Sequence, residues 1–305
     1  MMKKYLFLLG ISIMWGSQFY FAEQVLDTVA PMTLAAIRST IGACTLTLVA
    51  LLLPRAPSAS RPSLLYRRRY ILYMAVALFE AVIPFFLVAW GQTRVSSSVA
   101  SIVIGSTPLW TILIVWIVFR ERLHRHQTLG VVSGFIGLMI IFAPGIGRAQ
   151  TAIVSPDTVG LVALLLAAGS YAGALILMQY LPGESVVRSM RNVLWMASVM
   201  LWPMVFMTGT SEIMFRVADT PALLILGVFQ TGLVYWLYNL LVHVEGPVFA
   251  SFSNYLIPLV GIFLGSFLLN ERLTVPMVVG VIVVIGSIII SRTPPHTLQT
   301  NNIQR

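Results

Sequence analysis

The feature that most constrains this chain is a series of long apolar segments along almost its whole length. They span residues 5–24, 32–53, 70–90, 95–118, 127–144, 158–180, 189–208, 220–241, 247–269 and 274–291. The hydrocarbon core of a bilayer is about 30 Å thick and needs roughly 20 apolar residues for each helical crossing. The composition agrees, because only 10% of the 305 residues are charged, whereas soluble proteins carry about 25%. We predict an all-α polytopic membrane protein with ten transmembrane helices and no large domain outside the membrane.

Two other interpretations of the apolar segments fit less well. The first segment follows Lys3 and Lys4 as a signal peptide would, but it lacks a small-x-small cleavage site, and nine similar segments follow. Strands of a membrane β-barrel alternate apolar and polar residues, whereas residues 130–143 are almost continuously apolar. We therefore interpret the first segment as the first span and all the spans as helices.

The net charge of +9 indicates how the chain is oriented. In a soluble protein such an excess would suggest nucleic-acid binding. Here, an N-terminus in the cytoplasm places thirteen basic side chains on the inner side and four on the outer side, which is the asymmetry of the positive-inside rule. We predict that both termini are cytoplasmic. The basic run at 66–69 lies beside a span, which favours a topology anchor over an anionic-lipid or nucleic-acid patch; the expected surroundings are membrane lipids, with no nucleic-acid partner.

The two halves of the sequence resemble each other. Glu121-Arg122-Leu123 recurs as Glu271-Arg272-Leu273 at an offset of 150 residues, and Arg38 matches Arg191 at an offset of 153. We predict a first five-helix repeat at 1–148, a second at 155–293 and a cytoplasmic tail at 294–305. Because five is odd, the second copy must be inverted in the membrane. Inverted repeats are typical of secondary transporters, whose substrate site lies near the midplane between the repeats.

These motifs resemble the EamA domains of the drug/metabolite transporter superfamily. The resemblance rests on Trp15-Gly16-Ser17, on Arg38, and on a Pro-Leu pair followed by Glu-Arg-Leu before a glycine-rich span, a block that occurs twice. The second copy departs from it with Ala168-Gly169-Ser170 in place of Trp-Gly-Ser. The resemblance implies a ten-helix transporter of two inverted EamA units in a bacterial inner membrane. Such a transporter moves amino acids, other metabolites or drugs, often outward.

Glu80 is the candidate functional residue with the clearest chemistry. It lies about ten residues into the third span, about 15 Å deep at 1.5 Å per residue. An ionised carboxylate there costs several kcal/mol unless it is paired, hydrated or protonated. We expect Glu80 to couple proton movement to transport or to bind a cationic part of the substrate; the alternative is a structural hydrogen bond between helices. Its counterpart in the second repeat is Gln230, which cannot titrate.

Arg38 and Arg191 lie one or two turns inside their spans. An arginine there either extends to the headgroups, pairs with a carboxylate or holds an anionic substrate group. Structural anchoring and substrate contact are both open for Arg38, whereas anchoring is favoured for Arg191.

Aromatic and amide side chains form a second group of candidates. Tyr235, Tyr238 and Asn239 are spaced i, i+3, i+4 and share one helix face. A pocket with aromatic walls and amide hydrogen bonds suits an organic solute, while aromatics near span ends otherwise form interfacial belts. The further candidates for the pathway are Trp15, Gln18, Tyr171 and Asn254.

Proline and glycine positions predict bends and close helix packing. Pro108 and Pro258 occupy matched places in the repeats, and helix breaks at such places indicate gates or permanent bends. Gly-xxx-Gly patterns at 130/134, 169/173 and 261/265 let helices approach closely, either within the chain or in a homodimer.

The motifs for other functions are missing from the sequence. We find no phosphate loop, no His-Glu-xx-His and no Gly-x-Ser-x-Gly, and the single Cys44 excludes an internal disulfide. His124 and His126 alone make a weak metal signal. We predict a secondary transporter, not an enzyme, without cofactor or metal, that exports small organic metabolites by alternating access. Amino acids fit best because they satisfy both Glu80 and Arg38, and protons are a candidate co-substrate. A membrane-embedded enzyme and an uncoupled facilitator or channel are the alternatives.

Overall fold

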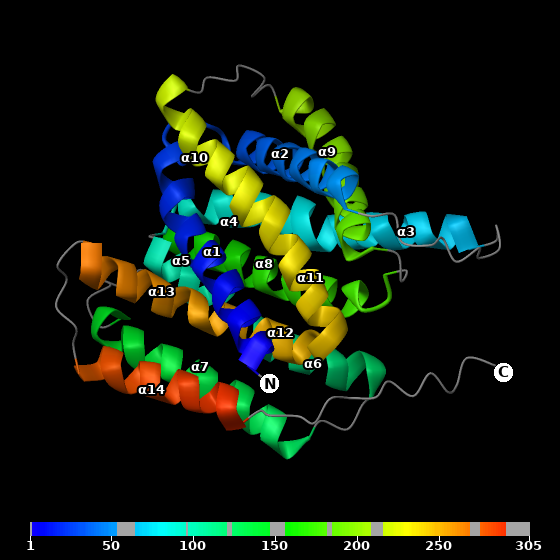
Figure 1. Cartoon of the computed structure of the whole chain (residues 1–305). Helices are drawn as coiled ribbons and strands as arrows, with labels where there is room; N and C mark the ends of the chain where they lie inside the picture. Colours follow the sequence, from blue (N-terminus) through cyan, green and yellow to red (C-terminus); the bar gives the residue numbers. More distant parts are fainter. Residues whose placement is uncertain are drawn as a thin grey trace.

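The computed structural model describes residues 2–53, 65–95, 97–120, 124–146, 156–181, 185–208, 216–268 and 275–290. Over these ranges all regular structure is helical, as Figure 1 shows. The prediction of an all-helical chain is thus confirmed for the described residues.

The helices follow the apolar segments in order. The first half contains α1 (Met2–Leu26), α2 (Pro31–Leu52), α3 (Leu65–Ala77), η1 (Leu78–Val82), α4 (Ile83–Gln92), α5 (Ser97–Ile104), α6 (Thr107–Phe119) and α7 (Arg125–Ile146). The second half contains α8 (Pro156–Met178), α9 (Val186–Met207), η2 (Val217–Asp219), α10 (Thr220–Leu224), η3 (Ile225–Leu233), α11 (Val234–Glu245), α12 (Pro247–Ser251), α13 (Ser253–Leu268) and α14 (Val275–Ile290). Each predicted segment therefore coincides with one helix or with a run of adjoining helices.

Seven helical stretches of the described residues are long and apolar enough to cross a membrane. They are Lys4–Leu26, Pro31–Leu52, Arg68–Gln92, Val99–Val118, Thr158–Met178, Val186–Met207 and Val217–Glu245. The three other predicted segments coincide with α7, with α12 and α13, and with α14. Many large apolar side chains of these helices are exposed, among them Leu52, Trp116 and Ile282, as lipid-facing side chains are. The chain is a multi-pass membrane protein.

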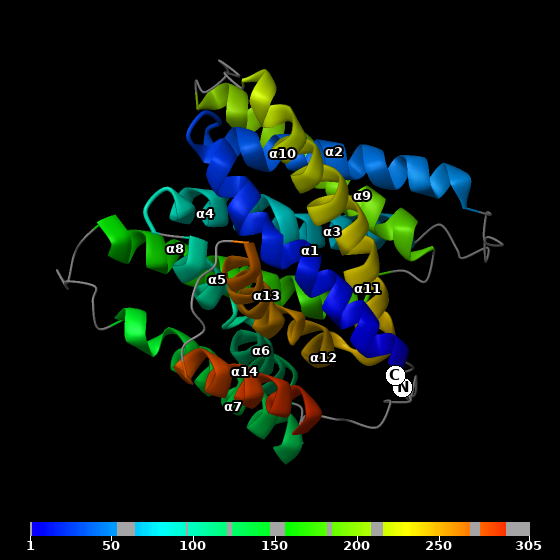
Figure 2. The same ribbon diagram turned by 60° about the vertical axis from the view of Figure 1, so that its left-hand side comes forward.

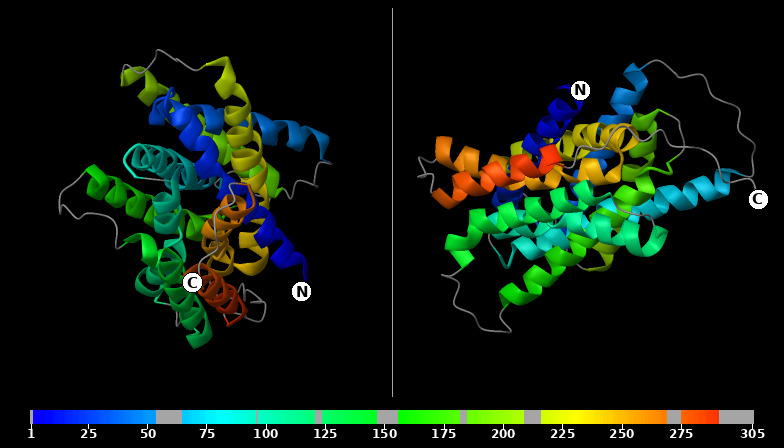
Figure 3. Two further views of the ribbon diagram at one scale, coloured as in Figure 1. Left: turned by 90° about the vertical axis from the view of Figure 1, so that its left-hand side faces the viewer. Right: turned by 90° about the horizontal axis from the view of Figure 1, so that it is seen from below.

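Contacts between the two halves are reciprocal. Helix α2 packs on α9, and α7 packs on α14. The contact of α1 with α13 has its counterpart in α8 with α6, and that of α1 with α11 in α8 with α4. Figures 1 and 2 place α7 and α14 side by side at one edge of the molecule, with α2, α9 and α10 at the opposite edge. Figure 3 shows α4, α5 and α8 between these edges.

A π-helix interrupts the α-helix in the middle of two long spans. These interruptions are η1 in the span Arg68–Gln92 and η3 in the span Val217–Glu245. In a π-helix each N–H bonds to the carbonyl five residues earlier, and π-turns occur frequently at functional sites. Glu80 lies in η1 and Gln230 in η3. The two residues that the sequence repeat pairs therefore occupy the same kind of irregularity in each half.

The two repeat-matched prolines differ in their helical environment. Pro108 lies in the first turn of α6, just after the break that follows α5, whereas Pro258 lies inside α13. A proline in the first turn removes no intrahelical hydrogen bond, because that N–H has no partner in any helix. Pro258, inside α13, lacks the N–H that an interior helical residue donates, whereas Pro108 costs α6 no hydrogen bond.

Glycines let several helices approach closely. A Cβ on Gly16 of α1 would lie 2.7 Å from the Cβ of Val260 in α13, and one on Gly134 of α7 would overlap the ring of Tyr255. At Gly169 the nearest atoms of a neighbouring helix are 3.8 Å away, which leaves room for a methyl group. Close packing therefore requires a glycine at Gly134 and not at Gly169.

Candidate functional site

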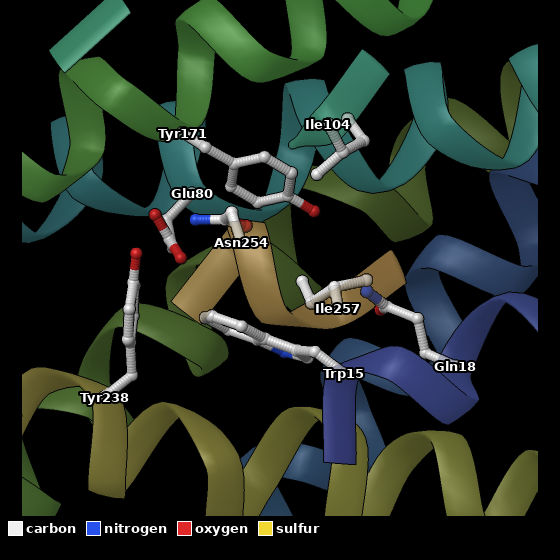
Figure 4. A pocket seen from close by; sticks show the side chains of 8 residues that line it. All are labelled: Trp15, Gln18, Glu80, Ile104, Tyr171, Tyr238, Asn254 and Ile257. Atoms are coloured by element: carbon white, nitrogen blue, oxygen red, sulfur yellow. The ribbon is translucent and has the colours of Figure 1, made fainter. Parts of the chain in front are cut away.

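A small buried cavity lies where helices of both halves meet. Eight side chains line it (Figure 4): Trp15, Gln18, Glu80, Ile104, Tyr171, Tyr238, Asn254 and Ile257. They come from α1, η1, α5, α8, α11 and α13. The space open to the centre of a water molecule is about 10 Å³, which is room for roughly one water. An organic solute enters only if the surrounding helices move apart.

Glu80 supplies the carboxylate of this cavity. Its side chain is 1% exposed, and neither carboxylate oxygen has a hydrogen-bond partner among the described residues. Other titratable groups nearby are the phenols of Tyr171 and Tyr238, which line the same cavity, and that of Tyr235, which donates a hydrogen bond to the backbone oxygen of Glu80 at 3.3 Å. A buried acid without partners costs free energy, so its retention favours a function that uses it.

Aromatic rings form the walls of the cavity. The ring of Trp15 packs edge-to-face against Tyr238, with ring centroids 4.4 Å apart, and against Tyr235 at 5.5 Å. Figure 4 shows Trp15 and Tyr171 on opposite sides of the space, with Glu80 beside the hydroxyl end of Tyr238. The cavity thus combines one carboxylate with several π-systems, an arrangement that binds cations.

Arg38 is buried close to this site but does not line the cavity. Its side chain is 4% exposed. Nε donates to Thr231 Oγ1 at 3.1 Å, Nη2 donates to Gln18 Oε1 at 3.0 Å and to the backbone oxygen of Gln230 at 3.3 Å, and the guanidinium lies 4.0 Å from the ring centroid of Phe85. Arg38 forms no ion pair with Glu80. Its contacts instead link α2 to α1, α4 and η3.

Side chains donate to the backbone carbonyls of the two π-helical regions. In η1, Ser170 Oγ donates to the backbone oxygen of Phe79 at 2.7 Å, and Tyr235 Oη donates to that of Glu80. In η3, Thr231 Oγ1 donates to the backbone oxygen of Leu226 at 2.8 Å, and Arg38 Nη2 donates to that of Gln230. A widened helix in a membrane has no water to satisfy its carbonyls, so other donors must do so. These bonds explain how both interruptions persist at membrane depth.

Two buried amides complete the polar interior. Gln230 Nε2 donates to Ser17 Oγ at 2.9 Å, whereas Gln230 Oε1 has no partner among the described residues. Asn239 of α11 is fully buried, and neither its Oδ1 nor its Nδ2 has a hydrogen-bond partner in the described part of the chain. Neither residue lines the cavity.

The sequence-predicted residues separate into three groups. Six of them meet in the cavity: Trp15, Gln18, Glu80, Tyr171, Tyr238 and Asn254. Three more lie behind the cavity and donate hydrogen bonds to residues of α1 or η1: Arg38, Gln230 and Tyr235. The last three do not line the cavity: Asn239, Pro108 and Pro258. Nothing in the sequence points to Ile104, Ile257, Phe85 or Thr231 as site residues. Apolar side chains in apolar spans carry no signal, and only the place of Thr231 beside Gln230 could have indicated it.

The remaining motifs lie away from the cavity. Arg191 is half-buried and donates to its neighbour Asn192 Oδ1 at 3.2 and 2.9 Å. The Glu-Arg-Leu motifs at 121–123 and 271–273 lie outside the described residues. His124 and His126 stack at 5.2 Å, and the described residues contain no group of three or more His, Cys, Asp or Glu side chains placed to hold a metal ion.

Comparison with known proteins identifies relatives along the whole chain. The model of the EamA-like transporter family matches residues 2–143 and again 158–293. An "Uncharacterized transporter" of Archaeoglobus fulgidus is 26% identical over 298 residues, covering 95% of this chain and 99% of that protein. The "Uncharacterized transporter YvbV" of Bacillus subtilis is 26% identical over 297 residues, covering 94% and 91%. "Protein PecM" of Dickeya dadantii is 23% identical over 279 residues, covering 90% and 88%.

A solved crystal structure has the same fold. It superposes with a TM-score of 0.74 at 13% sequence identity, covering 95% of this chain and 98% of that chain. The helical arrangement described above is therefore that of a known protein structure.

Proposed function

The chain belongs to the EamA-like transporter family, and we propose that it is a secondary active transporter that exports small organic metabolites by alternating access. The substrate class is amino acids and related compounds, with drugs as a further class. The observation that carries the proposal is the buried cavity between the two halves, with a partnerless carboxylate at its side. An ionisable side chain inside a membrane span is by default a candidate for the functional site.

The proposed architecture is ten crossings in two inverted five-helix repeats, with both termini cytoplasmic in a bacterial inner membrane. The reciprocal contacts, such as α1 with α13 and α8 with α6, support this arrangement, because a pseudo-two-fold axis relates such pairs in inverted repeats. The matched π-helices of the third and eighth predicted spans support it as well. Membrane lipids surround the bundle, and a homodimer is compatible with its exposed apolar helices.

The size of the cavity supports alternating access. A space for roughly one water does not admit a metabolite, so the described conformation is closed around the site. Transport then requires the halves to rock apart on one side at a time. In this scheme the break between α5 and α6 and the position of Pro258 inside α13 are the proposed flexible points.

Proton coupling is assigned to Glu80. The carboxylate faces the cavity with no fixed hydrogen-bond donor on its oxygens, so a proton or a cationic solute is the partner available to it. Gln230, its counterpart in η3, cannot exchange a proton. The coupling site is therefore in one half only.

Flux into proteoliposomes tests the function. The purified protein is reconstituted, and uptake of a panel of labelled amino acids is measured with and without an imposed pH gradient. We expect saturable flux that the gradient accelerates, and E80Q is expected to remove the acceleration while E23Q, at an exposed position of α1, retains it. Saturable flux without any gradient dependence indicates an uncoupled facilitator. No flux for any amino acid, metabolite or drug of the panel contradicts transport.

A further inference from the structure

We propose that the cavity recognises its solute by an ammonium group and offers no cation to a carboxylate, so that organic amines bind better than the corresponding amino acids. This inference rests on the transport function proposed above and revises its substrate class, because it places organic amines ahead of amino acids. It concerns the eight cavity-lining residues and Arg38 behind them.

The acidic end of the cavity suits an ammonium group. Glu80 is 1% exposed, and both of its carboxylate oxygens lack hydrogen-bond partners among the described residues. An ammonium has three donors and no acceptor, so it supplies what these oxygens lack. Figure 4 shows the carboxylate beside the hydroxyl end of Tyr238 and close to the amide of Asn254.

The walls of the cavity away from Glu80 suit a flat or apolar part of a solute. Trp15 and Tyr171 lie on opposite sides of the space, and Ile104 and Ile257 line it away from Glu80. Aromatic faces attract a cation in addition to covering hydrocarbon. A solute with a charged amine at one end and an aromatic or aliphatic body therefore matches both parts of the cavity.

A solute carboxylate finds no matching charge there. None of the eight described lining side chains is an arginine, lysine or histidine. Arg38 is buried outside the lining, directs its Nε and Nη2 to Thr231, Gln18 and the backbone oxygen of Gln230, and lies over the ring of Phe85. A zwitterion would bring its carboxylate close to that of Glu80 with no cationic side chain among the described lining residues, which costs free energy.

Gln18 lies between Arg38 and the cavity and carries no charge. Its Oε1 accepts the hydrogen bond from Arg38 Nη2, so its amide N–H groups are the atoms left for a solute, and Gln18 lines the cavity. An amide N–H donates to a neutral carbonyl or hydroxyl oxygen without bringing a full charge. The solute class is therefore a cationic amine with an apolar body, with or without a neutral oxygen.

Binding of four matched ligands to the detergent-solubilised wild type tests this directly. Phenethylamine and phenylalaninamide carry only the ammonium, phenylalanine carries both charges, and 3-phenylpropionate carries only the carboxylate. We expect calorimetry to show that both amines bind at least about tenfold more tightly than phenylalanine, as one charge-assisted hydrogen bond and an unmatched charge predict, and that 3-phenylpropionate does not bind. Equal or tighter binding of phenylalanine, or binding of 3-phenylpropionate, overturns the inference.

A pair of variants locates the recognition. E80Q keeps the size of the side chain and removes its charge, and we expect it to weaken phenethylamine binding at least about tenfold. E23Q makes the same substitution at an exposed position of α1 and is expected to bind as the wild type does. If E80Q retains wild-type affinity for phenethylamine, Glu80 does not recognise the ammonium and the inference fails.

Flux separates this inference from the proposed function. If proteoliposomes transport phenylalanine and not phenethylamine, the chain is a transporter and the inference is wrong. If the amines bind through Glu80 but no ligand of any class is transported, the binding site stands and the transport function is wrong.

Discussion

Arg38 links both halves of the bundle through contacts that a lysine cannot reproduce. Its guanidinium makes hydrogen bonds at 3.1, 3.0 and 3.3 Å from two different nitrogens and stacks 4.0 Å from the ring centroid of Phe85. A lysine ammonium is a point charge without this planar fork, so in R38K we expect it to reach only one of the three acceptors.

The structure sets the size of this effect. Hydrogen bonds between membrane helices contribute about 0.6 kcal/mol on average and up to about 1.7 kcal/mol, so the loss of two costs about 1–3 kcal/mol. Loss of the stacked ring contact adds about 0.5–1 kcal/mol. We therefore expect R38K to lower the free energy of unfolding by about 2–4 kcal/mol.

Arg191 provides the matched control, because the repeat pairs it with Arg38. It donates only to Asn192, its neighbour on the same helix. R191K is therefore expected to change the free energy of unfolding by no more than about 0.5 kcal/mol.

Equilibrium unfolding in mixed micelles of rising SDS content, followed by tryptophan fluorescence, measures both variants. If R38K and R191K are equally stable, the contacts of Arg38 with α1 and η3 do not stabilise the bundle. The assignment of Arg38 to a structural role behind the cavity would then lose its basis.

Three further outcomes follow from the helix contacts. G42V should lower the free energy of unfolding by about 1–3 kcal/mol, because a Cβ on Gly42 would lie 2.8 Å from Thr231 Cγ2. G10A is the control in the same SDS titration: a Cβ on Gly10 meets no atom within 4 Å, so the free energy of unfolding should not change. T231V keeps the shape but removes the hydroxyl that accepts from Arg38 and donates within η3, and it should cost about 1–2 kcal/mol; a stability equal to wild type would show that this hydroxyl is dispensable. Lys4 and Glu245 form an ion pair 2.8 Å long, and each side chain is 17% exposed. A K4Q/E245Q double-mutant cycle should give a coupling free energy of about 0.5–1 kcal/mol that decreases in high salt. A coupling free energy that high salt leaves unchanged would contradict a partly exposed pair.

Several features of the site could be read from the sequence because they are local or repeated. The length of the apolar segments placed Glu80 near the middle of its span, and Glu80 is the thirteenth of the 25 residues from Arg68 to Gln92. Burial of a polar side chain in lipid is costly, so Gln18 and Asn254 were selected as candidates on the same ground, and both line the cavity. The family resemblance depended on motifs alone and is confirmed by the match over both halves.

Other features could not be read in this way because they depend on which helices meet. No residue pattern of 78–82 or 225–233 distinguishes a π-helix from an α-helix, since the same apolar composition serves both. The sequence also does not predict that Arg38 points towards Gln18 and Thr231 instead of Glu80, because the guanidinium is buried in either direction.

The sequence by itself determined that the chain is an all-helical membrane protein of repeated design with an acid in the middle of one span. It did so because the cost of exposing polar groups to lipid is paid locally, residue by residue along each helix. The tertiary structure alone decided that the acid faces a water-sized cavity between aromatic rings while the arginine is turned away into neutral hydrogen bonds. The different surroundings of Glu80 and Arg38 depend on how α1, α2 and η3 pack against one another. Such packing is set by pairs of helices and cannot be predicted from the residues of one span.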